Sequence, residues 1–403
     1  MKKIFAMTLL AALPLAAMAQ YEEGSENGVV SLAGREGFSI QTKKADFVFK
    51  PYLLVQTAAH INWYDDEGLD KAYNQDNLAN SGFAVPYAVL GFTGKAWGKV
   101  SFNLSINAAA SGGAILQQAW IDVAMKEAFA VRIGKFKTPF SHGYLTTLGE
   151  TMMPTLPTSL TAAVIMPYSL NAVTPNIGTG FDLGVEIHGF AANKFGYEIG
   201  IFNGTGASVN TATKTISDDW HIPSLLYVGR FTFMPKGIMP ATQGNPDRLH
   251  EDKWMLGASA NLNVESESES TNDTRAGLEF AMLKNKLYIG AEAYYMHVGF
   301  TDRQKIDKTY DFLGGYVQGG YFVAPRVQVA ARYDFFNRNG VDTNGFLNMP
   351  AVGCNYFFKN CNLKLQAMYQ FIGRTGHDTQ LDRDNDDLGL AKHSGTIQLQ
   401  YSF

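Results

Sequence analysis

The sequence predicts an all-β fold, a transmembrane antiparallel β-barrel of about 16 strands. Three observations lead to this prediction. Segments of about ten residues alternate between apolar and polar side chains, short and long connections alternate between these segments, and the chain begins with an export signal. Together they indicate a barrel in a bacterial outer membrane.

The export signal comes first. A basic start and an apolar run over residues 4–17 precede small residues at Ala17 and Ala19, which form an A-x-A cleavage site. Because Pro14 interrupts the run and a membrane span needs about 20 apolar residues, we do not expect a membrane anchor. The chain therefore divides into a signal peptide (1–19), a segment without a clear pattern to which we assign no structure (20–44), and the barrel (45–403).

The alternation is clearest in the last segment, residues 393–403. One face carries Gly395, Ile397, Leu399, Tyr401 and Phe403, and the other carries Ser394, Thr396, Gln398, Gln400 and Ser402. Strands of soluble proteins are usually about 5–6 residues long, whereas tilted membrane strands need about 9–11. The length of these segments therefore favours a barrel that crosses a membrane.

Sixteen such segments can be placed along the chain, an even number that puts both ends of the barrel on one side. They are predicted near 46–64, 82–96, 99–109, 113–126, 128–137, 180–192, 195–204, 223–235, 253–264, 274–284, 286–299, 310–324, 326–338, 347–358, 361–372 and 393–403. Tight connections, assigned to the periplasmic side, alternate with longer polar ones. Two connections depart from this rule, because 110–112 is short and 236–252 is long on the side of the tight turns.

Closure of the barrel assigns a role to the last residue. Lipid offers no hydrogen-bond partner for an open sheet edge, so the strand that ends at Phe403 is expected to pair with the first strand. A terminal aromatic after an alternating strand also resembles the assembly signal of outer-membrane proteins. The expected partners are therefore the barrel-assembly machinery, through Phe403, and outer-membrane lipid and lipopolysaccharide.

Composition excludes several other classes of function. The net charge of −4 gives no basic surface for nucleic acid. The histidines His142, His188, His297 and His393 are scattered, no serine lies in a G-x-S-x-G context, and metal-ligand spacings are absent. We therefore expect no enzyme, no cofactor and no metal. Cys354 and Cys361 would lie on different rungs of a hairpin, which predicts free thiols.

Two acidic clusters lie in predicted outer loops. One consists of Glu265, Glu267 and Glu269, and the other of Asp382, Asp384, Asp386 and Asp387. The second lacks the glycine and the twelfth acidic ligand of a calcium loop. Solvated surface charge is the favoured interpretation, and cations that bridge to lipopolysaccharide remain an alternative.

Four motifs, in order along the chain, resemble the phosphate-selective porin O/P family. They are VRIGKFKTPF (131–140), YEIGIFNG (197–204), GGYVQ (314–318) and AARY (330–333). The resemblance implies a 16-stranded homotrimeric porin whose third outer loop folds inward to narrow each channel. It also implies small polar or charged solutes, with anions such as phosphate among them.

The longest connection, from Thr138 to Thr179, fits that third loop. Apart from Glu150 it is nearly without charge, and it carries His142 as its one basic candidate. Loops of this length are usually functional or disordered, and its apolar content argues against a solvated segment. We predict that it packs inside the barrel, with His142 and Glu150 at a constriction; a flap over a subunit interface is the alternative.

The polar half of each strand supplies the predicted pore-lining charges. They are Lys99, Asp122, Lys126, Arg132, Asp182, Glu186, Glu198, Arg230, Arg275, Glu279, Glu292, Arg332, Asp334 and Lys364. Opposite signs are interleaved, which favours paired salt bridges on the wall over a dedicated anion track. Parity places Lys135 and Lys137 outward unless a bulge intervenes.

The sequence thus predicts a porin for passive diffusion of small polar or charged solutes, without a basis for phosphate specificity. Two other classes stay open. One is a structural or adhesive outer-membrane barrel with a closed lumen, and the other is an exported soluble β-sandwich or solenoid, which the long strands disfavour.

Overall fold

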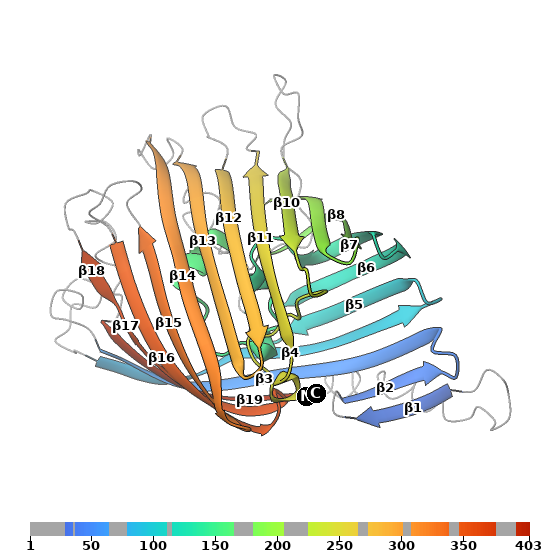
Figure 1. The fold of residues 1–403 in the computed structure, drawn as a ribbon, viewed down its shortest axis with the longest axis horizontal. Coiled ribbons are helices and arrows are strands. Elements are labelled where there is room, and N and C mark those ends of the chain that lie inside the picture. The colour runs from blue at the N-terminus through green and yellow to red at the C-terminus, as the bar shows by residue number, and fades with distance from the viewer. Residues whose placement is uncertain are drawn as a thin grey trace, which may run out of the picture.

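A computed structural model describes most of the chain as one curled antiparallel sheet (Figure 1). The described residues are 29–34, 37–63, 79–110, 115–164, 180–204, 225–264, 273–300, 308–337, 346–375 and 392–403. Within them, none of the helices is long and apolar enough to cross a membrane.

The strands follow the predicted segments closely. They are β1 (Val29–Gly34), β2 (Gly37–Thr42), β3 (Phe47–Trp63), β4 (Ala79–Ala96), β5 (Val100–Asn107), β6 (Leu116–Lys126), β7 (Phe129–Lys137), β8 (Phe181–Ala191), β9 (Phe195–Phe202), β10 (Leu226–Phe233), β11 (Asp252–Asn263), β12 (Asp273–Lys284), β13 (Leu287–Phe300), β14 (Lys308–Ala324), β15 (Val327–Asn337), β16 (Phe346–Lys359), β17 (Leu363–Phe371), β18 (Gly373–Thr375) and β19 (His393–Ser402). The short helices are α3 (His142–Leu145), η1 (Leu148–Glu150), α4 (Thr158–Val164) and η2 (Pro246–Arg248).

The sheet closes on itself where its first and last strands meet. β19 pairs antiparallel with β17 on one side and with β3 on the other. Beyond the last rung, Leu53 and Phe403 exchange two backbone hydrogen bonds of 3.1 Å each. β18 continues β17 along β16, so the closed barrel has 16 strands. The predicted strand number and the predicted pairing of the carboxyl-terminal strand are both confirmed.

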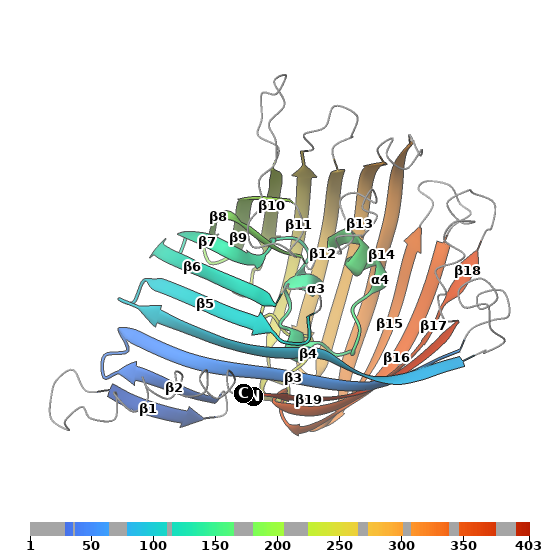
Figure 2. The ribbon, with the colours of Figure 1, turned by 180° about the vertical axis from the view of Figure 1, so that it is seen from behind.

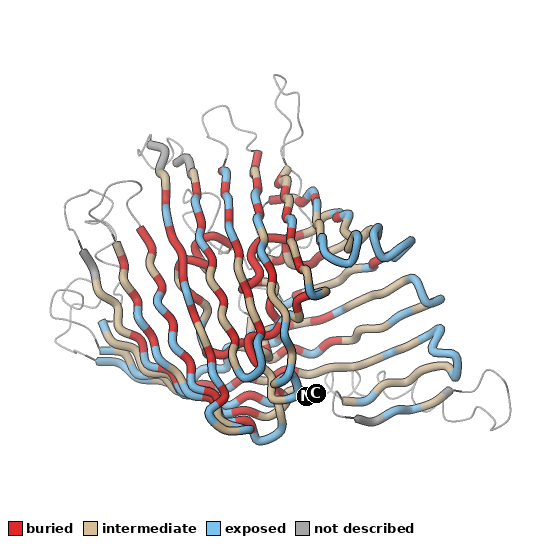
Figure 3. The backbone as a smooth tube through the Cα atoms, in the orientation of Figure 1, coloured by how far each residue is buried: buried red, intermediate tan, exposed pale blue. Residues whose placement is uncertain are grey.

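The alternation of the sequence becomes an outward and an inward face (Figure 3). In β19, Ile397 and Leu399 are 57% and 45% exposed on the outside, whereas Gln398 and Gln400 are 1% and 0% exposed on the inside. An apolar outer belt and a polar interior are the arrangement that a barrel needs in lipid.

Residues 29–42, part of the segment to which the sequence analysis assigned no structure, form a hairpin beside the barrel. β1 pairs with β2 along its whole length, and β2 pairs with β3 at two rungs, Ile40 with Phe49 and Gln41 with Val48. Gly37 lies close to Phe403 at the position where the barrel closes. The hairpin thus extends the edge of β3 near the chain terminus.

The two ends of the barrel differ, and we call the end with the short connections the tight-turn end. There β4 and β5 are joined by Trp97 and Gly98, which both have positive φ (51° and 68°). The connection from β10 to β11 is the exception at this end, because it runs over residues 234–251 and contains η2. The predicted long connection on this side is therefore confirmed. The predicted acidic clusters, Glu265 to Glu269 and Asp382 to Asp387, lie outside the described residues, as does 111–114 at the other end.

The register of β7 departs from the prediction at its carboxyl end. Gly134 has φ +131°, and a Cβ there would clash with the carbonyl oxygen of Ala119 on the neighbouring strand. Beyond it, Lys135 is 1% exposed, and the Lys137 ammonium donates hydrogen bonds to the carbonyl oxygens of Tyr144 (2.5 Å) and Thr146 (3.2 Å). Neither lysine is directed outward. The local distortion at Gly134 lets Lys135 be buried and Lys137 be half-buried.

Candidate functional site in the barrel lumen

The connection after β7, which we call the long loop (residues 138–164 in its described part), lies on the concave side of the sheet. Figure 2 shows α3 and α4 within the curve of the barrel. Phe140 and Leu160 are each 1% exposed and pack in one cluster with Tyr294, Tyr316 and Phe336 of the wall. The apolar side chains that set this loop apart in the sequence are therefore buried against the inside of the barrel.

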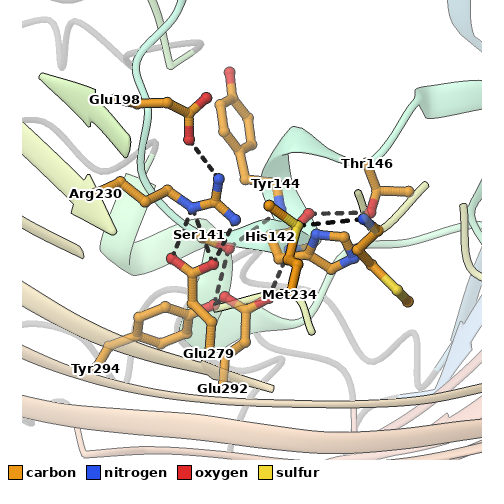
Figure 4. A network of polar contacts seen from close by, with 12 residues as sticks. Ser141, His142, Tyr144, Thr146, Glu198, Arg230, Met234, Glu279, Glu292 and Tyr294 are labelled. Atoms are coloured by element: carbon orange, nitrogen blue, oxygen red, sulfur yellow. Dashed lines mark hydrogen bonds and ion pairs between the residues drawn. The ribbon is translucent and has the colours of Figure 1, made fainter. Parts of the chain in front are cut away.

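A first polar contact holds the beginning of the long loop to β13 and β14. The Glu292 carboxylate accepts hydrogen bonds from the backbone N–H of Gly143 (2.5 Å) and from the hydroxyls of Tyr294 and Tyr316 (2.7 Å each). The Ser141 hydroxyl lies 3.2 Å from the Tyr294 hydroxyl (Figure 4). Glu292 therefore fixes α3 to the wall.

A second set of contacts holds α4 at both ends. At its start, the Asp334 carboxylate accepts from the backbone N–H of Thr158 (2.5 Å) and from the hydroxyl (2.6 Å) and backbone N–H (3.3 Å) of Ser159. At its end, the Arg275 guanidinium donates to the carbonyl oxygens of Ala162 (3.2 Å) and Ala163 (2.8 Å). An anion at the start and a cation at the end of a helix also match the direction of its dipole.

A third set of contacts lies between these two and uses carbonyl oxygens of the long loop. Inward-facing side chains of β15 to β19 donate to them: Arg332 to Thr155 (2.7 Å), Asn355 to Met152 (2.8 Å), Lys364 to Thr151 (2.7 Å), Gln366 to Thr151 (3.1 Å) and Gln400 to Gly149 (2.8 Å). The long loop is thus held against one side of the barrel, from β12 to β19.

Six of the other predicted wall charges, on β6 to β10 and on β12, form two ion-pair clusters. Arg230 contacts Glu198 at 2.5 Å and Glu279 at 2.8 Å, and Figure 4 shows the three side chains in a row. Arg132 contacts Asp122 at 2.9 Å and Glu186 at 3.4 Å. Each arginine is therefore compensated by two carboxylates, in keeping with a network of paired charges on the wall.

The predicted pore-lining residues fall into three groups in the structure. The first group is buried or half-buried on the inner face and consists of Asp122, Arg132, Asp182, Glu186, Glu198, Arg230 and Glu279. Bound to the long loop are Arg275, Glu292, Arg332, Asp334 and Lys364. Lys99 and Lys126 are exposed at the tight-turn rim, because Lys99 lies in the turn between β4 and β5 and Lys126 is the last residue of β6.

A cavity of about 820 Å³ occupies the tight-turn end beside the long loop. The wall contributes Lys50 and Thr93 of β3 and β4, and the long loop contributes Leu145 and the residues from Thr147 to Glu150. Its charged residues are Lys50, Lys137, Glu150, Asp247, Arg248 and Glu251. Only Glu150 among these was predicted as a site residue. The volume falls within the range of about 300–1,000 Å³ typical of small-molecule sites.

The two predicted constriction residues have different surroundings. Glu150 is half-buried at the cavity, where a carboxylate oxygen accepts a hydrogen bond from Asn245 (3.3 Å). His142 is 6% exposed in α3, and burial, with the nearby positive charge of Arg230, lowers its pKa to about 3. A neutral, enclosed imidazole contributes no charge to the path. Glu150 is the charged residue of the long loop that lines the cavity.

The cysteines form no disulfide. Both are free thiols, as predicted, with Cys354 exposed and Cys361 buried. Burial raises the pKa of the Cys361 thiol to about 12. Among the described residues, no group of three or more histidine, cysteine, aspartate or glutamate side chains is arranged to hold a metal ion.

Comparison with known proteins gives one family and one fold. The family model for phosphate-selective porin O and P matches residues 55–403. The fold is similar to that of an anion-selective porin from Comamonas acidovorans (TM-score 0.58, 10% identity, 89% of this chain and 100% of that chain). It is also similar to the outer-membrane channel DcaP of Acinetobacter baumannii (TM-score 0.56, 12% identity, 92% of this chain and 100% of that chain). A third similar structure is the trimer form of OmpT of Vibrio cholerae (TM-score 0.53, 11% identity, 89% of this chain and 99% of that chain). At these identities the likeness concerns the fold.

Proposed function

This chain belongs to the phosphate-selective porin O and P family and forms a channel in the bacterial outer membrane, and we propose that small polar or charged solutes cross it by passive diffusion without a strong preference for phosphate. Family and fold are those of a channel rather than an enzyme. The structural or adhesive barrel that the sequence leaves open is therefore disfavoured.

The pairing of the wall arginines is the observation that carries the selectivity part of this proposal. Arg132 and Arg230 are each bound by two carboxylates, and Arg275 is bound by Asp273 at 2.8 Å. A pore that selects phosphate must replace the hydration of the anion with uncompensated donors along its path. These three guanidinium groups already use their donors on wall carboxylates and, for Arg275, also on carbonyl oxygens of the long loop.

The cavity beside the long loop supports the same conclusion. Lys50 and Lys137 come from the wall, whereas Glu150, Asp247 and Glu251 come from the segments that enter the lumen. Charges of both signs therefore border the space through which a solute passes. Such a path discriminates by width and weakly by charge.

Reversal potential across a planar bilayer under a KCl gradient tests this proposal. We expect the cation-to-anion permeability ratio to lie within about threefold of one, because charges of both signs border the path. Millimolar phosphate is expected to leave the chloride current unchanged. Strong anion preference with block by phosphate would contradict the mixed-charge interpretation, and folded protein without conductance would contradict the channel itself.

We propose further that the chain assembles as a homotrimer. The family and the trimer form of OmpT support this assembly. Native mass spectrometry of detergent-extracted protein is expected to give three times the mass of the mature chain. A monomer mass under conditions that preserve a known porin trimer would rule the assembly out.

Other proposals rest on the sequence. The first is that residues 1–19 act as a cleaved signal peptide. The second is that the barrel-assembly machinery recognises Phe403. The third is that lipid and lipopolysaccharide surround the apolar outer belt. The backbone pairing of Phe403 with Leu53 supports the second, since it places the terminal residue on the closing seam of the barrel. N-terminal sequencing of the protein isolated from the outer membrane tests the signal-peptide proposal. A first residue other than Gln20 would contradict it.

A further inference from the structure

The connection between β10 and β11, which we call the mouth segment (residues 234–251), is long at the end where other connections are tight. It does not extend away from the barrel. Thr242 and Gln243 are 1% and 3% exposed, and Met239 is 6% exposed in a cluster that also contains Met152 of the long loop and Tyr288 of the wall. Burial of polar and apolar side chains alike indicates a segment packed into the structure.

Hydrogen bonds join the mouth segment to the long loop. The backbone N–H of Thr147 donates to Ala241 O (3.1 Å), and that of Gln243 donates to Glu150 O (3.0 Å). The Gln243 side-chain oxygen accepts from the backbone N–H of Met152 (3.1 Å). Two segments that enter from opposite ends of the barrel therefore meet and satisfy each other's backbone groups.

The mouth segment also reaches the far wall. Gln328 of β15, whose amide is buried on the inner face, donates to Gln243 O (3.2 Å). β15 lies five strands from β10 (β10-β11-β12-β13-β14-β15), roughly 24 Å along the wall at about 4.8 Å per strand. Gly244 allows this approach, because its φ is +125° and a Cβ there would clash with the Gln328 amide.

The last part of the mouth segment faces the cavity of about 820 Å³. Asp247 and Glu251 line that cavity together with Glu150 of the long loop, and Asp247 accepts a hydrogen bond from Asn360 in the turn between β16 and β17 (2.5 Å). Arg248 also lines it but is paired with Glu251 at 2.7 Å. Among the residues that line the cavity, the two entering segments thus contribute three carboxylates and one guanidinium, a net charge of −2, opposite Lys50 and Lys137 of the wall.

We propose that the mouth segment is a second constriction element, which narrows the tight-turn mouth and, through Asp247 together with Glu150, makes that mouth less permeable to anions. This inference rests on the proposed channel function. Its hydrogen bonds to the long loop and to Gln328 of β15 hold the mouth segment across part of the tight-turn end.

The size effect is tested by deleting residues 238–250. Nine residues then remain between the paired positions Phe233 and Leu256 (234–237 and 251–255), enough for a hairpin turn. We expect single-channel conductance to rise about twofold or more, since a segment that crosses the mouth is removed. Conductance equal to that of the wild type would overturn the constriction, and wild-type protein that is folded but does not conduct would instead overturn the channel function.

The charge effect is tested without deletion, so it does not depend on whether that variant folds. The double variant Glu150→Gln/Asp247→Asn is expected to lower the cation-to-anion permeability ratio by about twofold or more. The matched control is Asp252→Asn, which removes an exposed acid at the end of the same connection, paired with Lys236 and outside the cavity. An unchanged ratio in the double variant, or an equal shift in the control, would overturn the acidic contribution.

Discussion

Replacing Arg230 by Met is expected to lower the free energy of unfolding of the refolded barrel by about 3–5 kcal/mol. Arg230 is 7% exposed and neutralises Glu279, which is 3% exposed, as well as the more accessible Glu198. Removing one partner of a buried ion pair leaves an uncompensated charge in a region with little water. Urea unfolding in lipid vesicles, followed by tryptophan fluorescence, measures the change.

Two further variants separate this effect from a general loss of charge. Arg230→Met/Glu279→Gln is expected to recover most of the lost stability, because both members of the buried pair are then neutral. Lys236→Met removes a cation from an exposed pair with Asp252 and is expected to cost less than about 1 kcal/mol. Equal losses in Arg230→Met and Lys236→Met would show that the buried cluster is not a structural element.

The barrel could be predicted from the sequence because its signal is local and repeated. Each of the 16 strands lies within three residues of its predicted bounds, and such differences in length leave the apolar and polar faces unchanged because the alternation fixes them along the whole segment. The hairpin of β1 and β2 was missed for the opposite reason. Its strands are six residues long and join the barrel through two rungs, so neither length nor alternation distinguishes them.

The contacts of the long loop could not be predicted, because they depend on where its backbone lies. Predicted pore-lining charges such as Arg332 and Lys364 are bound to carbonyl oxygens at Thr155 and Thr151, and parity alone shows only that they point inward. Neutral amides such as Gln400 make equivalent contacts. Charge alone therefore does not identify the residues that hold the long loop, because an uncharged polar side chain at an inward position can donate equally well.

The cavity residues were missed for two distinct reasons. Lys50 lies on the same face of β3 as Gln56, so parity within the predicted strand could have identified it. Asp247 and Glu251 lie in a connection without regular alternation, where the sequence gives no direction for a side chain. Lys137 required knowledge of the distortion at Gly134, which only the backbone shows.

Replacing Asp334 by Ala is expected to increase mean single-channel conductance by about half or more and to make the open current noisier. The Asp334 carboxylate accepts three hydrogen bonds from Thr158 and Ser159 at the start of α4. Each hydrogen bond to a charged group contributes about 1.5–3 kcal/mol, so this end of α4 loses most of what holds it to the wall. Arg275 continues to hold the other end, which predicts fluctuation of the long loop rather than its complete release.

The matched control for this variant is Asp311→Ala on the neighbouring strand β14. The Asp311 carboxylate also accepts side-chain hydrogen bonds, from Tyr295 (2.5 Å) and His297 (2.7 Å), but its described contacts do not include the long loop. Its removal is therefore expected to leave conductance and noise unchanged. Asp334→Asn, which keeps one acceptor oxygen, should fall between the wild type and Asp334→Ala. If Asp334→Ala folds and conducts like the wild type, α4 does not limit the current, and the mouth segment becomes the stronger candidate for the narrowest point.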